Sequence, residues 1–182
     1  MSGCSTMQIN IPDNIAVVMP NNNISSDLII YIPEKTQTYT VKAQAGVVSV
    51  HFNIGKGINK LAPELAAKIF QEVNVSEEIP KELNGNEIAI KIIIDNVVVD
   101  PGFSTLSSST ASVKLIAELY QKNGSDKIEL VGVSEVTISP EIAVPLTYND
   151  NNYFNALNQA CIDATSQALS DLFRKINDEI TE

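Results

Sequence analysis

The chain has 182 residues, of which 44% are hydrophobic and 19% are charged, a balance typical of one globular domain rather than a disordered chain. Asp and Glu outnumber Lys and Arg by 22 to 12, which gives a formal net charge of −10. This charge repels nucleic acid and anionic lipid at long range, and the sequence has no basic stripe that would bind either one. The longest apolar run, IAIKIII, is interrupted by Lys91 and is far shorter than the roughly 20 residues that cross a bilayer.

The N-terminal residues 1–26 are rich in Asn, Ser and Pro, which favour turns and extended backbone. We interpret this segment as a flexible tether, or as a strand followed by a loop, and assign residues 27–182 to a single domain. Near the start of that domain, the stretches DLIIYIP and VVSVHFNIG contain β-branched and aromatic residues in the pattern of strands.

The hydrophobic period changes to that of a helix between residues 61 and 73. The apolar positions that fall on one face of this predicted helix are Leu61, Leu65, Ala66, Ile69, Phe70 and Val73. Pro63 and Glu64 suit its first turn, where a missing N–H costs nothing and a carboxylate meets the positive end of the dipole. The next stretch, NVSEEIPKELNGN, is predicted to be a connection.

Three strands and a long helix follow. EIAIKIIIDNVVVD predicts a central strand, TASVKLIAELYQ alternates cleanly between apolar and polar residues, and KIELVGVSEVTIS is the third strand. Asn123-Gly124 between the last two predicts an antiparallel hairpin with a tight turn. From residue 153 to residue 180, apolar residues recur at spacings of three and four, which predicts an amphipathic helix that covers the sheet.

These elements predict an α+β fold. We expect a mainly antiparallel sheet of about five strands, in the order ββαβββα, with two helices packed on one face of the sheet.

No set of residues in the sequence predicts a catalytic or metal site. His51 is the single histidine and is about ten times more typical of a polar strand position than of a catalytic triad. Gly55-Lys56-Gly57 lacks the spacing of a phosphate-binding loop, and the carboxylate pairs Asp95 with Asp100 and Glu77 with Glu78 are interpreted as surface charge. We expect no enzyme, no metal and no cofactor. The Ser/Thr-rich loop at residues 104–110 is interpreted as an exposed connection, with partner binding as the alternative.

The opening residues MSGCST suggest where the protein resides. Ser2, Gly3, Cys4 and Ser5 resemble the end of a bacterial lipoprotein signal peptide, in which the cysteine becomes the lipidated first residue of the mature protein. No charged and apolar leader precedes them, so the resemblance implies that a signal peptide has been removed. It also implies lipid attachment, including palmitate, at Cys4, and Ser5 resembles the residue that directs sorting to the outer membrane. A disulfide between Cys4 and Cys161 is not expected.

The order of LAPELAAKIFQEV, EIAIKIIIDNVVVD, the hairpin and NALNQACIDATSQALSDLFRKI resembles the YajG family of small envelope lipoproteins over residues 25–178. The resemblance implies an outer-membrane protein that faces the periplasm and has no catalytic residues.

Our leading hypothesis is therefore a non-enzymatic envelope lipoprotein that presents an interaction domain to other envelope proteins and touches the membrane only through the lipid on Cys4. A second hypothesis is a structural subunit of a larger secretion, flagellar or polymer-export complex, and homo-oligomers formed through strand edges are a related alternative. A third is a carrier of a small ligand or lipid.

Overall fold

The computed structural model describes residues 6–9, 24–45, 48–100, 108–124, 127–139, 141–143 and 150–181. Over these ranges the chain forms strands and helices in the following order: β1 (Thr6–Ile9), β2 (Ile24–Tyr31), α1 (Glu34–Gln37), β3 (Val41–Ala45), β4 (Val48–Phe52), α2 (Ile54–Ala66), β5 (Phe70–Ser76), β6 (Glu87–Asp100), β7 (Ser108–Lys122), β8 (Ile128–Ile138), β9 (Glu141–Ala143) and α3 (Asp150–Thr181).

The strands form two sheets. The larger sheet has the strand order β5-β2-β6-β7-β8, with the short β9 paired to the start of β7. β7 is antiparallel to both β6 and β8, whereas β2 is parallel to both β5 and β6. In the smaller sheet, β4 pairs in parallel with β1 and antiparallel with β3. The predicted α+β class is confirmed, and the larger sheet is mixed because β2 joins both its neighbours in parallel.

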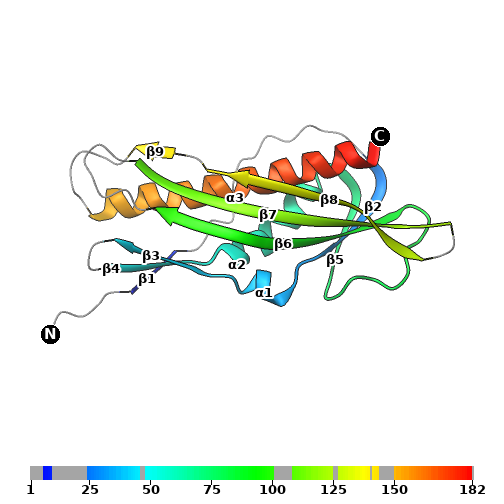
Figure 1. Ribbon diagram of the computed structural model, residues 1–182, viewed down its shortest axis with the longest axis horizontal. Coiled ribbons are helices and arrows are strands. Elements are labelled where there is room, and N and C mark those ends of the chain that lie inside the picture. The colour runs from blue at the N-terminus through cyan, green and yellow to red at the C-terminus, as the bar shows by residue number, and fades with distance from the viewer. Residues whose placement is uncertain are drawn as a thin grey trace.

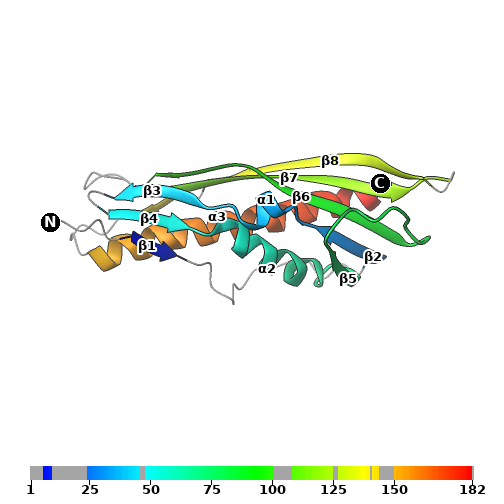
Figure 2. The ribbon, with the colours of Figure 1, turned by 90° about the horizontal axis from the view of Figure 1, so that it is seen from below.

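The helices lie on one side of the larger sheet. α3 packs against β7 and β8, and α2 packs against α3. Figure 1 is seen from the other side, where β6, β7 and β8 lie in front of α3. Figure 2 shows the same strands edge-on, with both long helices on the same side of them. We call the side that carries α3 the inner face and the opposite side the outer face.

The core lies between the inner face and α3. The alternating apolar residues of β7 are buried, and so are four isoleucines that share one face of β6: Ala111, Val113, Leu115, Ala117, Leu119, Ile88, Ile90, Ile92 and Ile94. They meet the apolar stripe of α3, in which Leu169, Leu172, Phe173 and Ile176 have no exposed surface. The predicted amphipathic helix and its position over the sheet are thus confirmed.

α2 lies earlier in the sequence than predicted. It begins at Ile54 and ends at Ala66, so Pro63 lies inside the helix rather than in its first turn. The N-terminus is fixed by tertiary contact, since the Gly55 amide donates to the Tyr39 carbonyl oxygen at 3.0 Å. A Cβ on Gly55 would lie 1.9 Å from the Thr36 carbonyl oxygen, so only glycine permits this approach. The sequence pattern alone does not reveal that constraint.

The last residues of the predicted helix, from Phe70 onward, instead form the strand β5. Phe70 and Val73, which we assigned to the apolar helical face, pair with Ile24 and Leu28 of β2. Their spacing of three fits a helix, but the strand pairing provides the backbone hydrogen bonds here. The connection predicted before β6 is present from residue 77 to residue 86.

The antiparallel hairpin of β7 and β8 is confirmed, but its turn is wider than predicted. β7 ends at Lys122 and β8 begins at Ile128, and the Asn123 amide donates to the Lys127 carbonyl oxygen at 2.8 Å. Gly124 does not have a positive φ, so this is not the two-residue turn that Asn-Gly commonly forms.

The predicted tether contains one described strand. Thr6–Ile9 forms β1 beside β4, which corresponds to the strand-and-loop alternative, and residues 24–26 belong to β2. Cys4 and the rest of residues 1–26 lie outside the described residues.

Candidate interaction surface

The structure shows where the residues that the sequence offered as candidates for catalysis or metal binding lie. Half-buried His51 lies in β4, opposite Gln8 of β1 and Lys42 of β3. Asp95 and Asp100 are five residues apart on β6, which corresponds to about 16 Å along a strand, so the two carboxylates do not converge. Over the part of the chain that the structure describes, no group of three His, Cys, Asp or Glu side chains is placed to hold a metal ion.

Two further sequence candidates lie in or beside connections between strands. Glu77 and Glu78 are exposed in the connection after β5. In the Ser/Thr-rich loop, residues 104–107 lie outside the described residues, whereas residues 108–110 belong to β7 and pair with β9. The loop is therefore shorter than predicted, because its last three residues add to the sheet.

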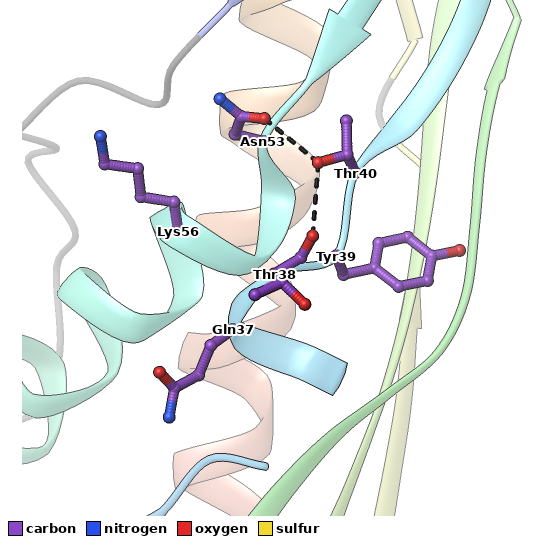
Figure 3. A pocket seen from close by; sticks show the side chains of 6 residues that line it. All are labelled: Gln37, Thr38, Tyr39, Thr40, Asn53 and Lys56. Carbon is purple, nitrogen blue, oxygen red and sulfur yellow. Dashed lines mark hydrogen bonds between the residues drawn. The ribbon is translucent and has the colours of Figure 1, made fainter. Parts of the chain in front are cut away.

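Lys56 of the Gly-Lys-Gly triplet borders a shallow pocket of about 270 Å³ between the end of α1 and the start of α2. The Thr40 hydroxyl lies 3.2 Å from Asn53 Oδ1 and 3.4 Å from the Thr38 carbonyl oxygen (Figure 3). Gln37 and Tyr39 complete the lining. The lining is mainly neutral and polar, and the hydroxyl that would bind a ligand already has protein partners.

The outer face of the larger sheet carries a cluster of charged groups. Lys91 Nζ of β6 lies 2.8 Å from Glu118 Oε2 of β7, and the Tyr120 hydroxyl donates to the same oxygen at 2.6 Å. Hydrogen bonds from Lys91 and then Tyr120 lower the pKa of Glu118. Burial, followed by the hydrogen bond to Glu118, raises the pKa of Tyr120 to about 12. The cluster is therefore an ion pair with a neutral tyrosine at pH 7, and it joins β6 to β7.

A second ionic contact lies on the same face. Lys114 Nζ lies 2.8 Å from Asp95 Oδ2 and 3.5 Å from Glu135 Oε2. The hydrogen bond to Asp95 is the largest cause of the raised pKa of Lys114. Because these three residues come from β6, β7 and β8, the contact joins three strands on the side of the sheet opposite α3 (Figure 1).

Apolar side chains are exposed on β8, next to these charges. Leu130, Val131 and Val133 are 52%, 53% and 49% exposed, and we call these three residues the β8 patch. Leu130 and Val133 lie opposite Tyr120 and Glu118, which places them on the outer face. Val131 is the extra residue of a β-bulge, since the register shifts between Leu119 and Tyr120. A contiguous exposed apolar patch is a feature of protein-binding surfaces.

Sequence reasoning did not identify the β8 patch. The sequence IELVGV has apolar residues at both odd and even positions, and this departure from alternation was the available signal of a bulge with exposed apolar side chains. The cluster of Lys91, Glu118 and Tyr120 was also missed, because the sequence does not show which residues of two strands lie opposite each other.

Comparisons with known proteins identify the fold. No protein-family model matches the chain, and no curated protein matches it. Among solved structures, protein XCC0632 from Xanthomonas campestris, described as a member of DUF330, aligns with a TM-score of 0.57 at 10% identity, covering 96% of this chain and 99% of that one. This likeness shows a shared fold.

Two other solved structures align less closely. The hypothetical protein CT253 from Chlamydia trachomatis has a TM-score of 0.46 at 9% identity, covering 86% of this chain and 96% of its own. A candidate lipoprotein from Caulobacter crescentus has a TM-score of 0.42 at 12% identity, covering 80% and 89%. Among the described residues, no helix is both long enough and apolar enough to cross a membrane.

Proposed function

We propose that this chain is a non-enzymatic cell-envelope lipoprotein. In this proposal a lipid on Cys4 holds it in the outer membrane, and its α+β domain faces the periplasm and binds other envelope proteins. The anchor is supported by Ser2, Gly3 and Cys4, which resemble a lipoprotein processing site. A single lipid-bearing cysteine leaves the whole domain free to interact with partners.

The observation that carries the binding role is the exposure of the β8 patch. Three large apolar side chains are exposed within four residues of β8, and two of them, Leu130 and Val133, lie on the outer face of the sheet, opposite α3. Exposing them to water costs free energy that a partner recovers on binding, at about 25 cal/mol per Å² of buried apolar surface. The free strand edge beside the patch also supports the second hypothesis, a subunit of a larger envelope assembly.

Metabolic labelling tests the anchor. Residues 4–182 are expressed behind a bacterial lipoprotein signal peptide in cells fed an alkyne-tagged palmitate, next to the matched variant Cys4→Ser. We expect label on the membrane-bound protein with Cys4 and none on the variant. The variant keeps Cys161, so label on the variant would show that the acyl group is attached at a site other than Cys4. An unlabelled, soluble protein with Cys4 would rule out the anchor.

Site-specific photo-crosslinking in cells tests the binding role. A photoreactive residue is placed at Val133 in the β8 patch or, as the matched control, at exposed Glu64 of α2. We expect adducts with envelope proteins from position 133 and not from position 64. Recovery of the uncrosslinked chain alone from both positions would contradict the proposed function.

A further inference from the structure

β8 ends the larger sheet on one side. Ten of its eleven residues pair with β7, and within the described residues no other strand pairs with its opposite edge. In an antiparallel pair, the N–H and C=O of one residue point to the same side of the strand, and the direction alternates from residue to residue. About half the backbone groups of β8 therefore face away from β7, where an additional strand could pair with them.

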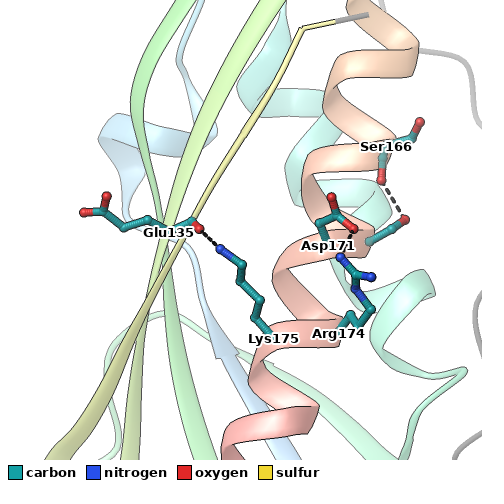
Figure 4. Close-up of polar contacts among 6 residues, drawn as sticks. Glu135, Ser166, Asp171, Arg174 and Lys175 are labelled. Atoms are coloured by element: carbon teal, nitrogen blue, oxygen red, sulfur yellow. Dashed lines mark hydrogen bonds and ion pairs between the residues drawn. The ribbon is translucent and has the colours of Figure 1, made fainter.

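One contact from α3 indicates which backbone groups of β8 point to the free edge of the sheet. Lys175 Nζ donates to the backbone carbonyl oxygen of Glu135 (Figure 4). The contact with Lys175 indicates that the carbonyl of Glu135 points to the free edge rather than to β7. The register is regular from Gly132 to Ile138, and Val133, two residues earlier, therefore faces the same way.

The hydrogen bond from Lys175 occupies one backbone carbonyl of the β8 edge. Lysine is a common means of preventing accidental strand pairing, but here β8 itself has no Lys or Arg, and the cation comes from the neighbouring helix. Lys175 is exposed, so water can replace the Glu135 carbonyl as its partner, and displacing it should weaken docking by only about fivefold.

Charge distinguishes between the possible occupants of this edge. The two charged residues of β8 are Glu129 and Glu135, and the whole chain carries a formal net charge of −10. A second copy would bring another −10 to the same edge, whereas a segment rich in lysine or arginine would place cations opposite these glutamates. The edge at β5 is less suited to binding, because β5 has seven residues and one large exposed apolar side chain, Val75.

We propose that the free edge of β8 binds an extended, basic segment of another protein by strand addition, and that Lys175 leaves the Glu135 carbonyl when the segment docks. Backbone hydrogen bonds form with the N–H and C=O groups of Val133 and Glu135 at the free edge. Alternate apolar side chains of the segment contact the β8 patch. This inference rests on the proposed role in protein binding and specifies its site and the chemistry of its partner.

The test uses the full chain made lipid-free by Cys4→Ser. The probe is a synthetic peptide of about ten residues that alternates valine or threonine with lysine, and its counterpart has glutamate in place of lysine. Titration calorimetry is expected to show binding of the basic peptide and at least about tenfold weaker binding of the acidic one. Binding of both peptides with equal affinity, or of neither, would overturn the proposal.

Two variants that each remove one positive charge from α3 isolate the role of Lys175. Lys175→Ala frees the Glu135 carbonyl, whereas Arg174→Ala removes a cation whose contact is with Asp171 at 2.9 Å. We expect Lys175→Ala to bind the basic peptide about fivefold more tightly than Arg174→Ala, because only the first removes a competing hydrogen bond. Equal affinities would show that Lys175 does not compete for the edge.

Backbone readouts locate the bound peptide. Val133→Pro removes an outward N–H and is expected to weaken peptide binding at least about tenfold, with a circular dichroism melt to verify folding. In the unsubstituted β8 strand, amide exchange at Val133 and Glu135 should slow when the peptide binds. Slower amide exchange at residues outside β8, with no change at Val133 and Glu135, would overturn the proposal. Dimerisation of the Lys175→Ala chain without peptide would also overturn it. Crosslinks from position 133 without peptide binding would leave the proposed function standing and reject the strand-addition site.

Discussion

Gly55 occupies a position where the backbone leaves no room for a side chain. A Cβ there would lie 1.9 Å from the Thr36 carbonyl oxygen and 2.6 Å from that of Gln37. We predict that Gly55→Ala destabilises the domain by about 3 kcal/mol, because backbone rather than a flexible side chain must move. Urea unfolding followed by circular dichroism measures the loss. The control, Gly85→Ala, has open space at its Cβ and should change stability by less than about 0.5 kcal/mol.

Cys161 is predicted to be unreactive in the native protein. Its side chain is 1% exposed, and burial raises the pKa of the thiol to about 12, so the reactive thiolate is scarce at pH 8. In a Cys4→Ser chain, a thiol reagent at pH 8 should label Cys161 slowly in buffer and rapidly in urea. Fast labelling without denaturant would show that α3 opens readily from the sheet.

Glu118 is predicted to make stability depend on pH. Its folded-state pKa is lowered by Lys91 and Tyr120 from the reference value of 4.5, so its contribution is present above pH 4.5 and disappears as the pH falls through the folded-state pKa. Glu118→Gln should cost about 1 kcal/mol at pH 7, and its difference from the unsubstituted chain should narrow below pH 4.5. Urea titrations between pH 3 and pH 7 provide the measurement, and a difference that does not vary with pH would contradict the role of this ion pair.

At the scale of elements, α3 contributes much of the core. Phe173 is fully buried against the inner face, and Phe173→Ala should lower the free energy of unfolding by about 3 to 5 kcal/mol. The adjacent Arg174 is exposed and forms a surface ion pair with Asp171, so Arg174→Ala should cost less than about 0.5 kcal/mol. Chemical denaturation compares the two. A loss below about 1 kcal/mol for Phe173→Ala would mean that the helix is held chiefly by other contacts.

The sequence was sufficient to predict elements whose period is set by a single buried face. β7 alternates without interruption from Ala111 to Leu119, and the stripe of α3 follows the helical period. The start of α2 was not predictable, because it depends on the approach of Gly55 to the backbone of residues 36–39. β5 was misassigned because Phe70 and Val73 satisfy the helical spacing, while their strand partners lie more than 40 residues earlier.

The candidate surface was less accessible to sequence reasoning than the fold. A free strand edge could be anticipated for a small open sheet, but its identity depends on strand order, which places β2 between β5 and β6. The exposure of Leu130, Val131 and Val133 depends on a bulge, and the covering of the edge depends on Lys175, which lies 40 residues from its partner.

The whole molecule is acidic, and this sets its behaviour in solution. At pH 7 the charge of −10 should keep the lipid-free Cys4→Ser chain monomeric, because copies repel one another. Self-association should rise near pH 4.5, the isoelectric point calculated from the sequence, where the repulsion vanishes. Light scattering in low salt from pH 4 to pH 8 measures the average molar mass and so distinguishes the monomer from the self-associated form. A stable dimer at pH 7 would show that an attractive interface outweighs the repulsion.

The position of β2 in the sheet constrains the order in which the chain can fold during its synthesis. β2 lies between β5 and β6, so its neighbours emerge from the ribosome roughly 40 to 60 residues after it does. The inner face then stays uncovered until α3, the last element, has been made. Such distant pairings close slowly, and uncovered apolar strands are prone to aggregate in the meantime. When the lipid-free Cys4→Ser chain is made in the cytoplasm without a signal peptide, it should therefore depend on chaperones until synthesis is nearly complete, and slowing translation within the α3 codons should lower the yield of folded protein.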